Sequence, residues 1–395
     1  MEKIGVTRNQ KGMTMSGIVL SASVRQNLLS LQSTADLLST TQNRLATGNK
    51  VNSALDNPTS YFTARSLDNR AGDINNLLDG IGNGVQVLQA ANTGITSLQK
   101  LVDTAKSIAQ QVLQAPVGYS TKSSVTSGAV TGGTAANLLG TGLVQGDVLT
   151  IASTGGGTAS SITFGTGAAE VDTLTELNAA LAANNLQASV DDTTGKITIT
   201  TTNDAASATV GALGGTAIGA GKAFLPASTT VVAKVADVAS QATRANLVAQ
   251  YTNIVTQITT TAQDSSYNGI NLLNGDNLKL TFNETGKSTL NISGVTFNAS
   301  GLGLTSLVAG TDFLDSGSAN KVITALGNAS NSLRSQASAL GSNLSIVQIR
   351  QDFSKNLINV LQTGASNLTL ADTNEEAANS QALSTRQSIA VSALA

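Results

Sequence analysis

The chain lacks the side chains that carry most enzyme chemistry. Its 395 residues include no His, no Cys and no Trp. Without an imidazole or a thiol, the sequence offers no histidine acid–base catalyst, no thiol nucleophile and no zinc site of the usual kind. The absence of Cys also excludes disulfide bonds. Any catalysis would therefore depend on carboxylates or on a glycine-rich phosphate loop.

Three local patterns could still carry chemistry, and each has a simpler interpretation. Gly155–Gly157 could approach a phosphate, but no Lys follows, and neither the G-x-G-x-x-G nor the Walker A pattern occurs. Glu375–Glu376 could be paired catalytic carboxylates, but acids in the first turn after Asp372 more simply complement a helix dipole. Asp191–Asp192 lacks EF-hand spacing, so a solvated turn is favoured over calcium. The sequence predicts no enzyme, no cofactor and no metal site.

Charge and hydropathy argue against several classes of partner. Lys+Arg 22 against Asp+Glu 24 gives a net charge of -2, and only 12% of residues are charged. This balance gives no electrostatic reason to expect binding to nucleic acid or to an anionic membrane surface. We also expect no small-molecule substrate. No stretch of about 18 apolar residues could span a membrane, and the first residues lack the apolar segment of a cleaved secretory signal. The composition is typical of a structural or assembly protein.

Apolar residues recur in steps of three, four and seven near both ends of the chain, which predicts helices with a seam for a partner. The predicted assembly seam consists of Val24, Leu28, Leu31, Ala35, Leu38 and Leu45 in the first helix and Ala378, Ala382 and Ile389 in the last. Burying about ten large apolar side chains in residues 18–48 contributes roughly 15–30 kcal/mol. Ordering about thirty residues costs on the order of 30–60 kcal/mol, partly offset within a lone helix. We therefore expect the chain ends to need a partner surface, which self-association supplies.

The rest of the chain predicts a mainly α fold: a long antiparallel helical bundle or coiled coil formed by both chain ends, with a small β-hairpin region and an inserted, β-rich α+β outer domain. A continuous stripe predicts one helix from Asn57-Pro58 to about 114, for which an ordinary bundle core is the favoured interpretation. Further stripes begin at Val231 and near Leu326. Short β-like runs lie at 278–282, 289–292 and 295–297 and within the insert. The insert also contains a capping-box pattern at Thr173 and Glu176 and a hairpin-turn signal at Asp191–Gly195.

Four segments of the sequence resemble bacterial flagellin of an alphaproteobacterial type. They are Ser39–Gly48, Val51–Pro58, Tyr267–Gly275 and Ala371–Glu376. The resemblance covers both ends of the chain in the right order, around an insert that varies in the family. It implies a structural subunit that polymerises into the flagellar filament for swimming motility, with no catalysis.

The resemblance also implies a domain organisation, in which the chain-end helices form the inner tube of the filament and the helical bundle forms the outer tube. The expected segments are an extension at 1–15 (with Met15 as an alternative start), an N-terminal inner-tube helix and connector at 16–56, the bundle domain at 57–116 and 231–371 with its β-hairpin, a variable outer domain at 117–230 and a C-terminal inner-tube helix at 372–395. Family members usually continue a few helical turns further than Ala395, so either the sequence is truncated or this last helix is short.

The partners that the resemblance implies are other copies of the chain, an export chaperone, the filament cap protein and the hook-associated proteins. The expected location is the extracellular filament, which the chain reaches through the flagellar export apparatus without a cleaved signal peptide. Two alternatives stay open at this point. One is the hook–filament junction protein, which resembles flagellin at both ends. The other is a surface adhesin carried by residues 117–229.

A last expectation concerns the innate-immune receptor for flagellin. Flagellins that it detects carry an Arg-rich stretch resembling Leu-Gln-Arg-Ile-Arg-Glu on their first long helix. The matching residues here are Leu98, Gln99, Lys100, Leu101, Val102 and Asp103. Lys100 and Val102 replace the two arginines, so the planar guanidinium forks are lost. The resemblance therefore predicts weak or absent activation of that receptor.

Overall fold

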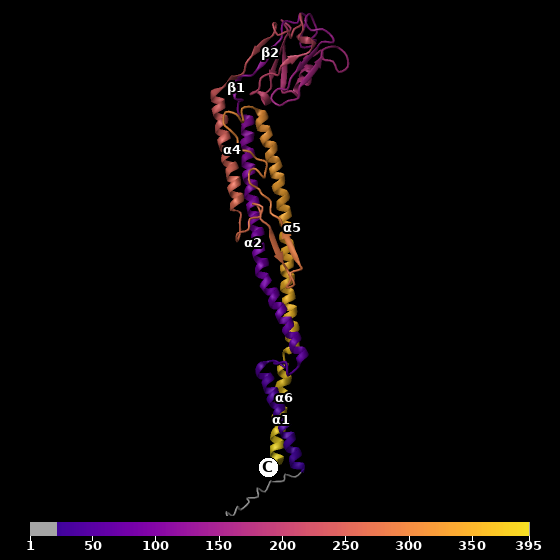
Figure 1. The fold of residues 1–395 in the computed structure, drawn as a ribbon, viewed down its shortest axis with the longest axis vertical. Coiled ribbons are helices and arrows are strands. Elements are labelled where there is room, and N and C mark those ends of the chain that lie inside the picture. The colour runs from indigo at the N-terminus through magenta and orange to yellow at the C-terminus, as the bar shows by residue number, and fades with distance from the viewer. Residues whose placement is uncertain (1–21, 395) are drawn as a thin grey trace, which may run out of the picture. The chain divides into compact units, whose positions relative to one another are not determined.

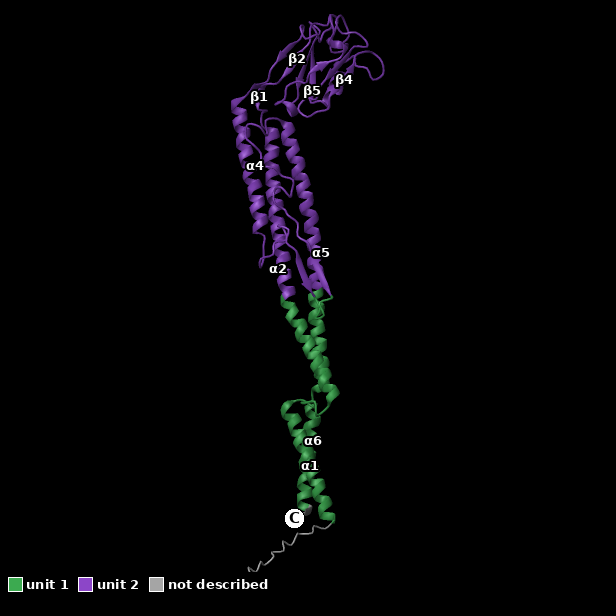
Figure 2. Ribbon diagram, viewed as in Figure 1, with its two compact units in different colours: residues 1–79, 282–287, 350–395 green, residues 80–281, 288–349 purple. Residues whose placement is uncertain are grey.

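The computed structural model describes residues 22–394, which divide into two compact units (Figure 2). The first unit contains residues up to 79, 282–287 and those from 350 onward, and the second contains 80–281 and 288–349. Helices α2 (Pro58–Gln114) and α5 (Ser316–Thr369) contribute residues to both units. The units therefore differ from the segments expected from the sequence. The prediction of a mainly helical fold with a β-rich middle region is confirmed.

In the first unit the two chain ends form a pair of helices, α1 (Ala22–Thr47) and α6 (Thr373–Leu394), which lie side by side (Figure 1). Helix α1 ends before Gly48, whose φ of 71° is the left-handed conformation that glycine adopts at helix ends. The remaining helical parts of this unit, from α2 and α5, share a small apolar core. Its buried members are Ala71, Ile74, Ile358 and Leu361.

In the second unit α4 (Val238–Asp264) lies beside α2 (Figure 1). The prediction that this helical stripe begins at Val231 was wrong. Residues 230–236 instead form strands β8 (Thr230–Val232) and β9 (Val235–Ala236). β-Branched valines favour the strand, and Asp237 then caps α4 by accepting from the N–H groups of Ala239 and Ser240.

A buried arginine ties three segments of the second unit together. Arg244 of α4 is fully buried, and its guanidinium donates to the carbonyls of Val112, Ala115, Pro116 and Phe313 at 2.5–3.0 Å. Val112 lies in the last turn of α2, and Ala115 directly follows that helix. The arginine thus satisfies carbonyls that a helix end leaves without intrahelical partners. No local sequence pattern marks Arg244 for this role.

A β-hairpin packs against α2 in the same unit. Its strands β10 (Leu278–Thr281) and β11 (Thr289–Ile292) pair antiparallel, with Leu278 opposite Ile292. Residues 295–297, expected to add a strand, contribute only the isolated bridge between Asn274 and Thr296. A Cβ on Gly84 would collide with the side chain of Leu280, so this helix glycine permits the close approach of the hairpin.

The β-rich insert has its own core and three small sheets. Its sheets have the orders β5-β6-β2-β8, β4-β3-β7 and β1-β9. The predicted capping box at Thr173 and Glu176 opens α3, and the predicted turn at Asp191–Gly195 joins β5 to β6. The elements not yet given are β1 (Tyr119–Thr121), β2 (Ser124–Thr126), β3 (Val148–Ile151), β4 (Ser160–Thr163), α3 (Leu174–Ala182), β5 (Leu186–Asp191), β6 (Lys196–Thr201), η1 (Asn203–Ala205), β7 (Leu213–Gly214) and η2 (Thr216–Ile218).

Candidate assembly interface

The pairing of α1 with α6 is antiparallel and leaves one side of each helix partly covered. The covered positions of α1 include Leu31, Leu38 and the buried Thr41, in steps of seven and three. The covered positions of α6 continue from Glu376 through Leu383 and Gln387. These steps are those of a coiled-coil seam. The two chain ends thus partner each other through one narrow face.

The other sides of this helix pair are unusually apolar. Six large apolar residues of the pair are between 39% and 66% exposed. They are Leu28, Leu29, Leu37 and Leu45 of α1 and Ile389 and Val391 of α6. Part of this surface borders a cavity of about 520 Å³ lined by Leu37, Arg386 and Ile389 among others. The pair therefore offers apolar surface that the described part of its own unit does not cover.

The structure separates the residues of the predicted assembly seam. Val24, Leu31, Ala35 and Leu38 are partly covered. Leu28, Leu45, Ala378, Ala382 and Ile389 are exposed. In α6 the covered face instead follows Glu376, Ser380, Leu383, Gln387 and Ala390, so the three predicted α6 residues do not lie on the face toward α1. Whether the seam residues contact another copy stays a prediction.

An ion pair joins the two helices next to the connector. The Nη1 atom of Arg44 lies 3.3 Å from Oε1 of Glu376, whose side chain is only 11% exposed. Both Glu375 and Glu376 lie in the first turn of α6, as expected for acids that complement a helix dipole, but Glu376 is buried and Glu375 is exposed. Asp372 does cap α6, because its Oδ1 accepts from the N–H groups of Asn374 and Glu375 at 2.9 and 3.3 Å. Sequence alone gave no signal for the partner of Glu376, which lies 332 residues away.

The connectors that follow α1 and precede α6 are hydrogen-bonded to each other. Asn49 and Leu370 form an antiparallel bridge. The N–H groups of Lys50 and Val51 donate to the carbonyl of Thr369 at 2.7 and 3.2 Å. The N–H of Ala371 donates to the carbonyl of Gly48 at 2.9 Å. The chain ends are therefore held together by backbone geometry as well as by side chains.

A carboxylate fixes the remainder of the first connector. One oxygen of Asp56 accepts from the N–H groups of Asn52 and Ser53, at 2.9 and 2.8 Å, and from the Ser53 hydroxyl at 3.2 Å. The backbone bonds from Ser53 and Asn52 hold the pKa of Asp56 below its ordinary value. Asn57 then caps α2, accepting from the N–H of Ser60 at 3.0 Å, which confirms the predicted helix start.

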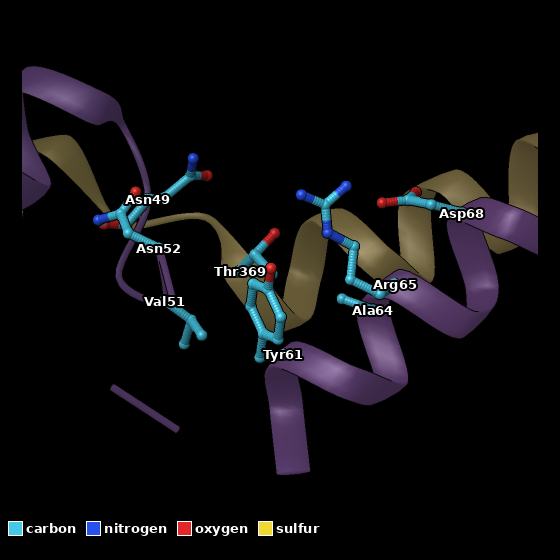
Figure 3. Close-up of a pocket in the computed structure, with 8 residues that line it drawn as sticks. All are labelled: Asn49, Val51, Asn52, Tyr61, Ala64, Arg65, Asp68 and Thr369. Carbon is cyan, nitrogen blue, oxygen red and sulfur yellow. The ribbon is translucent and has the colours of Figure 1, made fainter. Parts of the chain in front are cut away.

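A small pocket lies beside these connectors (Figure 3). Its volume is about 170 Å³, below the roughly 300–1,000 Å³ of most ligand pockets. The guanidinium of Arg65 lies over the ring of Tyr61 at 5.6 Å from its centroid. The lining residues are Asn49, Val51, Asn52, Tyr61, Ala64, Arg65, Asp68 and Thr369.

Two further findings concern the described residues 22–394. Within them, no group of three or more acidic residues is arranged to hold a metal ion. No helix in that range is long and apolar enough to cross a membrane.

The stretch matched to the receptor-binding residues of flagellin is divided between core and surface. Leu98 and Val102 are fully buried, and Gln99 and Leu101 are partly covered. Lys100 and Asp103 are exposed. Val102 is thus a core residue of the second unit, so only Lys100 presents a cation on this stretch.

The fold is mainly helical, with paired chain-end helices, hydrogen-bonded connectors and a β-rich insert that lies between them in the sequence. Residues 19–127 match the family model for the bacterial flagellin N-terminal helical region. The flagellins FljM and FljK of Caulobacter vibrioides are 29% and 28% identical over 150 residues, which are 38% of this chain and 54% of each relative. The match thus spans about half the length of these curated relatives. These findings confirm the predicted resemblance to bacterial flagellin, which the family model places in residues 19–127.

The comparisons also bear on the two alternatives that the sequence left open. The relatives that match are flagellins, including FljO of the same organism at 29% identity. Neither the hook–filament junction protein nor the surface adhesin is favoured by these findings. The mainly helical fold with paired chain ends accords with the flagellin interpretation.

Proposed function

We propose that the chain is the structural subunit of a bacterial flagellar filament and polymerises through its paired ends. The observation that carries this proposal is the apolar outer surface of α1 and α6, with residues such as Leu29, Leu37 and Ile389 more than half exposed. Each such side chain contributes about 1.5–3 kcal/mol when it is fully buried. A second copy of the chain carries an apolar surface that can cover this one. When two different surfaces of identical chains meet in this way, repeated contacts generate a helical polymer.

The similarity to flagellins extends the proposal to location and partners. The filament lies outside the cell, and the chain reaches it through the flagellar export apparatus without a cleaved signal peptide. An export chaperone covers the C-terminal helices beforehand, the cap protein directs addition at the tip, and hook-associated proteins join the filament to the hook. The subunit performs no catalysis, and it binds no nucleic acid, membrane or small-molecule substrate.

Self-assembly of the purified full-length chain tests the proposal directly. Sulfate strengthens apolar burial, so filaments grown by salting out can be sheared into seeds. Electron microscopy then follows elongation from the seeds by fresh protein. We expect seeded elongation by the unmodified chain. Failure of the folded protein to form or elongate filaments under these conditions would contradict the proposal.

A charge on the outer side of α1 tests the surface itself. Leu37 is 54% exposed, so Leu37→Asp should leave the helix pair folded yet place an unpaired carboxylate in any polymer contact made there. We expect elongation to fall at least 100-fold. Val144→Asp, on a 47% exposed residue of the insert, is the matched control and should elongate normally.

A further inference from the structure

A loop from within the β-rich insert contacts the beginning of α5, and both belong to the second unit. The Ser207 hydroxyl donates to Oδ2 of Asp315, the residue that directly precedes α5. Nδ2 of Asn320 donates to Oδ1 of Asp204 at 3.3 Å. A Cβ on Gly317 would collide with the carbonyl oxygen of Asp204, so the loop approaches the helix closely there. We call Asp204, Ser207, Asp315 and Gly317 the insert latch.

The buried carboxylate of Asp315 has a partner on each side of this contact. Its Oδ1 accepts from the N–H of Ser318 at 2.8 Å, which caps the first turn of α5. Its Oδ2 accepts from Ser207 of the insert. A buried charge that loses a hydrogen-bond partner carries a free-energy penalty. The same carboxylate therefore links the order of the insert loop to the order of the helix end.

A lysine ties the loop to the strands through which the chain enters and leaves the insert. Lys234, which lies between β8 and β9, donates from its Nζ atom to the carbonyl of Ser207. The same Nζ atom lies over the ring of Tyr119 in β1, 5.3 Å from its centroid. Strand β1 follows α2 in the chain and β9 precedes α4. The covalent connections of the insert thus lead to α2 and α4, and the insert latch adds a non-covalent connection to α5.

We propose that the insert latch is a strap that holds the insert in one orientation on the helical part of the second unit and couples it to the first turn of α5. Domains joined by linkers and a small interface are expected to move relative to each other, whereas a third point of attachment opposes such motion. The inference goes beyond the proposed function, because it concerns a single copy of the chain and needs no polymer.

A glycine pair in α5 supplies a matched test of the close contact. Gly317→Ala places a methyl group against the Asp204 carbonyl and should displace the loop. Gly327→Ala is the control, because a Cβ there would meet no other atom within 4 Å. Both substitutions replace a helical glycine by alanine, so their effects on helix propensity are similar. A difference between the two variants therefore reports on the insert latch.

Distances between two spin labels measure the orientation of the insert in the monomer. The chain has no Cys, so Val144→Cys in the insert and Asn331→Cys in α5, both exposed residues, introduce one specific pair. We expect a narrow distance distribution in the unmodified background and in Gly327→Ala. In Gly317→Ala the distribution should broaden about twofold or more, as for a domain held by its linkers.

Hydrogen exchange tests the coupling through Asp315 without changing α5. Losing a hydrogen bond to a charged group corresponds to about a 10- to 100-fold change in an equilibrium constant. We therefore expect Ser207→Ala, a substitution in the insert, to make the Ser318 amide exchange about tenfold faster. Ser161→Ala, on an exposed serine of β4, is the control and should leave that amide unchanged.

Each measurement can overturn the inference. A broad distance distribution in the unmodified background would show that the insert is not held. Equal distributions in Gly317→Ala and Gly327→Ala would show that the contact with Asp204 does not hold it. Equal exchange of the Ser318 amide in Ser207→Ala and Ser161→Ala would refute the coupling. If circular dichroism shows that Gly317→Ala is unfolded, the distance distribution of Ser207→Ala against that of Ser161→Ala decides in its place. None of these results depends on filament formation, so the proposed function stands or fails separately.

Discussion

Replacing Arg244 by Ala removes a buried group that joins α4 to the end of α2 and to the segment before α5. Four carbonyls, those of Val112, Ala115, Pro116 and Phe313, then lose their donor. A hydrogen bond to a charged group contributes about 1.5–3 kcal/mol net, so simple addition gives an upper limit of roughly 6–12 kcal/mol. Such terms are not additive, and water can reach carbonyls at a loosened helix end. We therefore expect a loss of about 3–5 kcal/mol in the unfolding free energy, as for other broken buried charge networks.

Arg244→Lys tests whether the positive charge alone, without the planar guanidinium group, is enough to hold the carbonyls. Burial lowers the pKa of Arg244 while Asp315 opposes that shift, and an arginine stays charged at neutral pH. A lysine keeps the charge but cannot reach four carbonyls in this fixed geometry, so we expect most of the loss to remain.

Urea unfolding followed by circular dichroism, with native-state hydrogen exchange of α4 amides as a local probe, measures the effect of Arg244→Ala. Arg334→Ala, on an exposed arginine of α5, is the control and should stay within about 0.5 kcal/mol of the unmodified chain. A loss below 1 kcal/mol for Arg244→Ala, with unchanged exchange in α4, would refute the reasoning that this arginine joins the three segments.

Three further predictions follow from the connector, the insert and the receptor stretch. Because the pKa of Asp56 is lowered in the folded chain, its carboxylate stabilises the connector fully above its ordinary pKa of 3.8, and this stabilisation is lost as the pH falls through the lower folded-state pKa. Asp56→Asn should abolish this pH dependence, measured by hydrogen exchange of the Asn52 and Ser53 amides. Strands β1 and β9 pair Thr121 with Val235, so replacing residues 122–234 by a short Gly/Ser linker should leave a folded chain that still polymerises; a helical but assembly-incompetent product would show that the insert supplies an essential contact. A reporter-cell assay should show weak activation of the innate-immune flagellin receptor by the unmodified chain, and Lys100→Arg should raise this activation. Val102→Arg should unfold the second unit locally, because Val102 is fully buried. Potency of the unmodified chain equal to that of an Arg-bearing flagellin would contradict the prediction.

Local signals predicted much of the fold. The Asn57 cap, Pro58 at the first helical position and the continuous apolar stripe placed α2 at 58–114, the range that the structure shows. The capping box at Thr173 and the turn at 191–195 were equally visible, because a few neighbouring residues determine them. These features depend on contacts of short sequence separation, which a single sequence records directly.

Features that depend on distant partners could not be predicted in the same way. The face of α6 that meets α1 was not predicted, because it carries Glu376, Ser380 and Gln387, which an apolar pattern does not select. Arg244 and the Arg44–Glu376 ion pair were missed for the same reason, since their partners lie far along the chain. Residues 231–236 were assigned to a helix because valines spaced by three and four satisfy both patterns, and only pairing with β2 and β1 decides for the strand.

The contact between Arg44 and Glu376 joins residues that are 332 positions apart. A ribosome therefore has to synthesise nearly the whole polypeptide before α1 can meet α6, and closing so large a loop is slow compared with local helix formation. A nascent chain that carries only its N-terminal half cannot form the paired ends, whatever the concentration of finished subunits around it. A chain truncated before Thr373 therefore leaves α1 without the helix that covers its inner face.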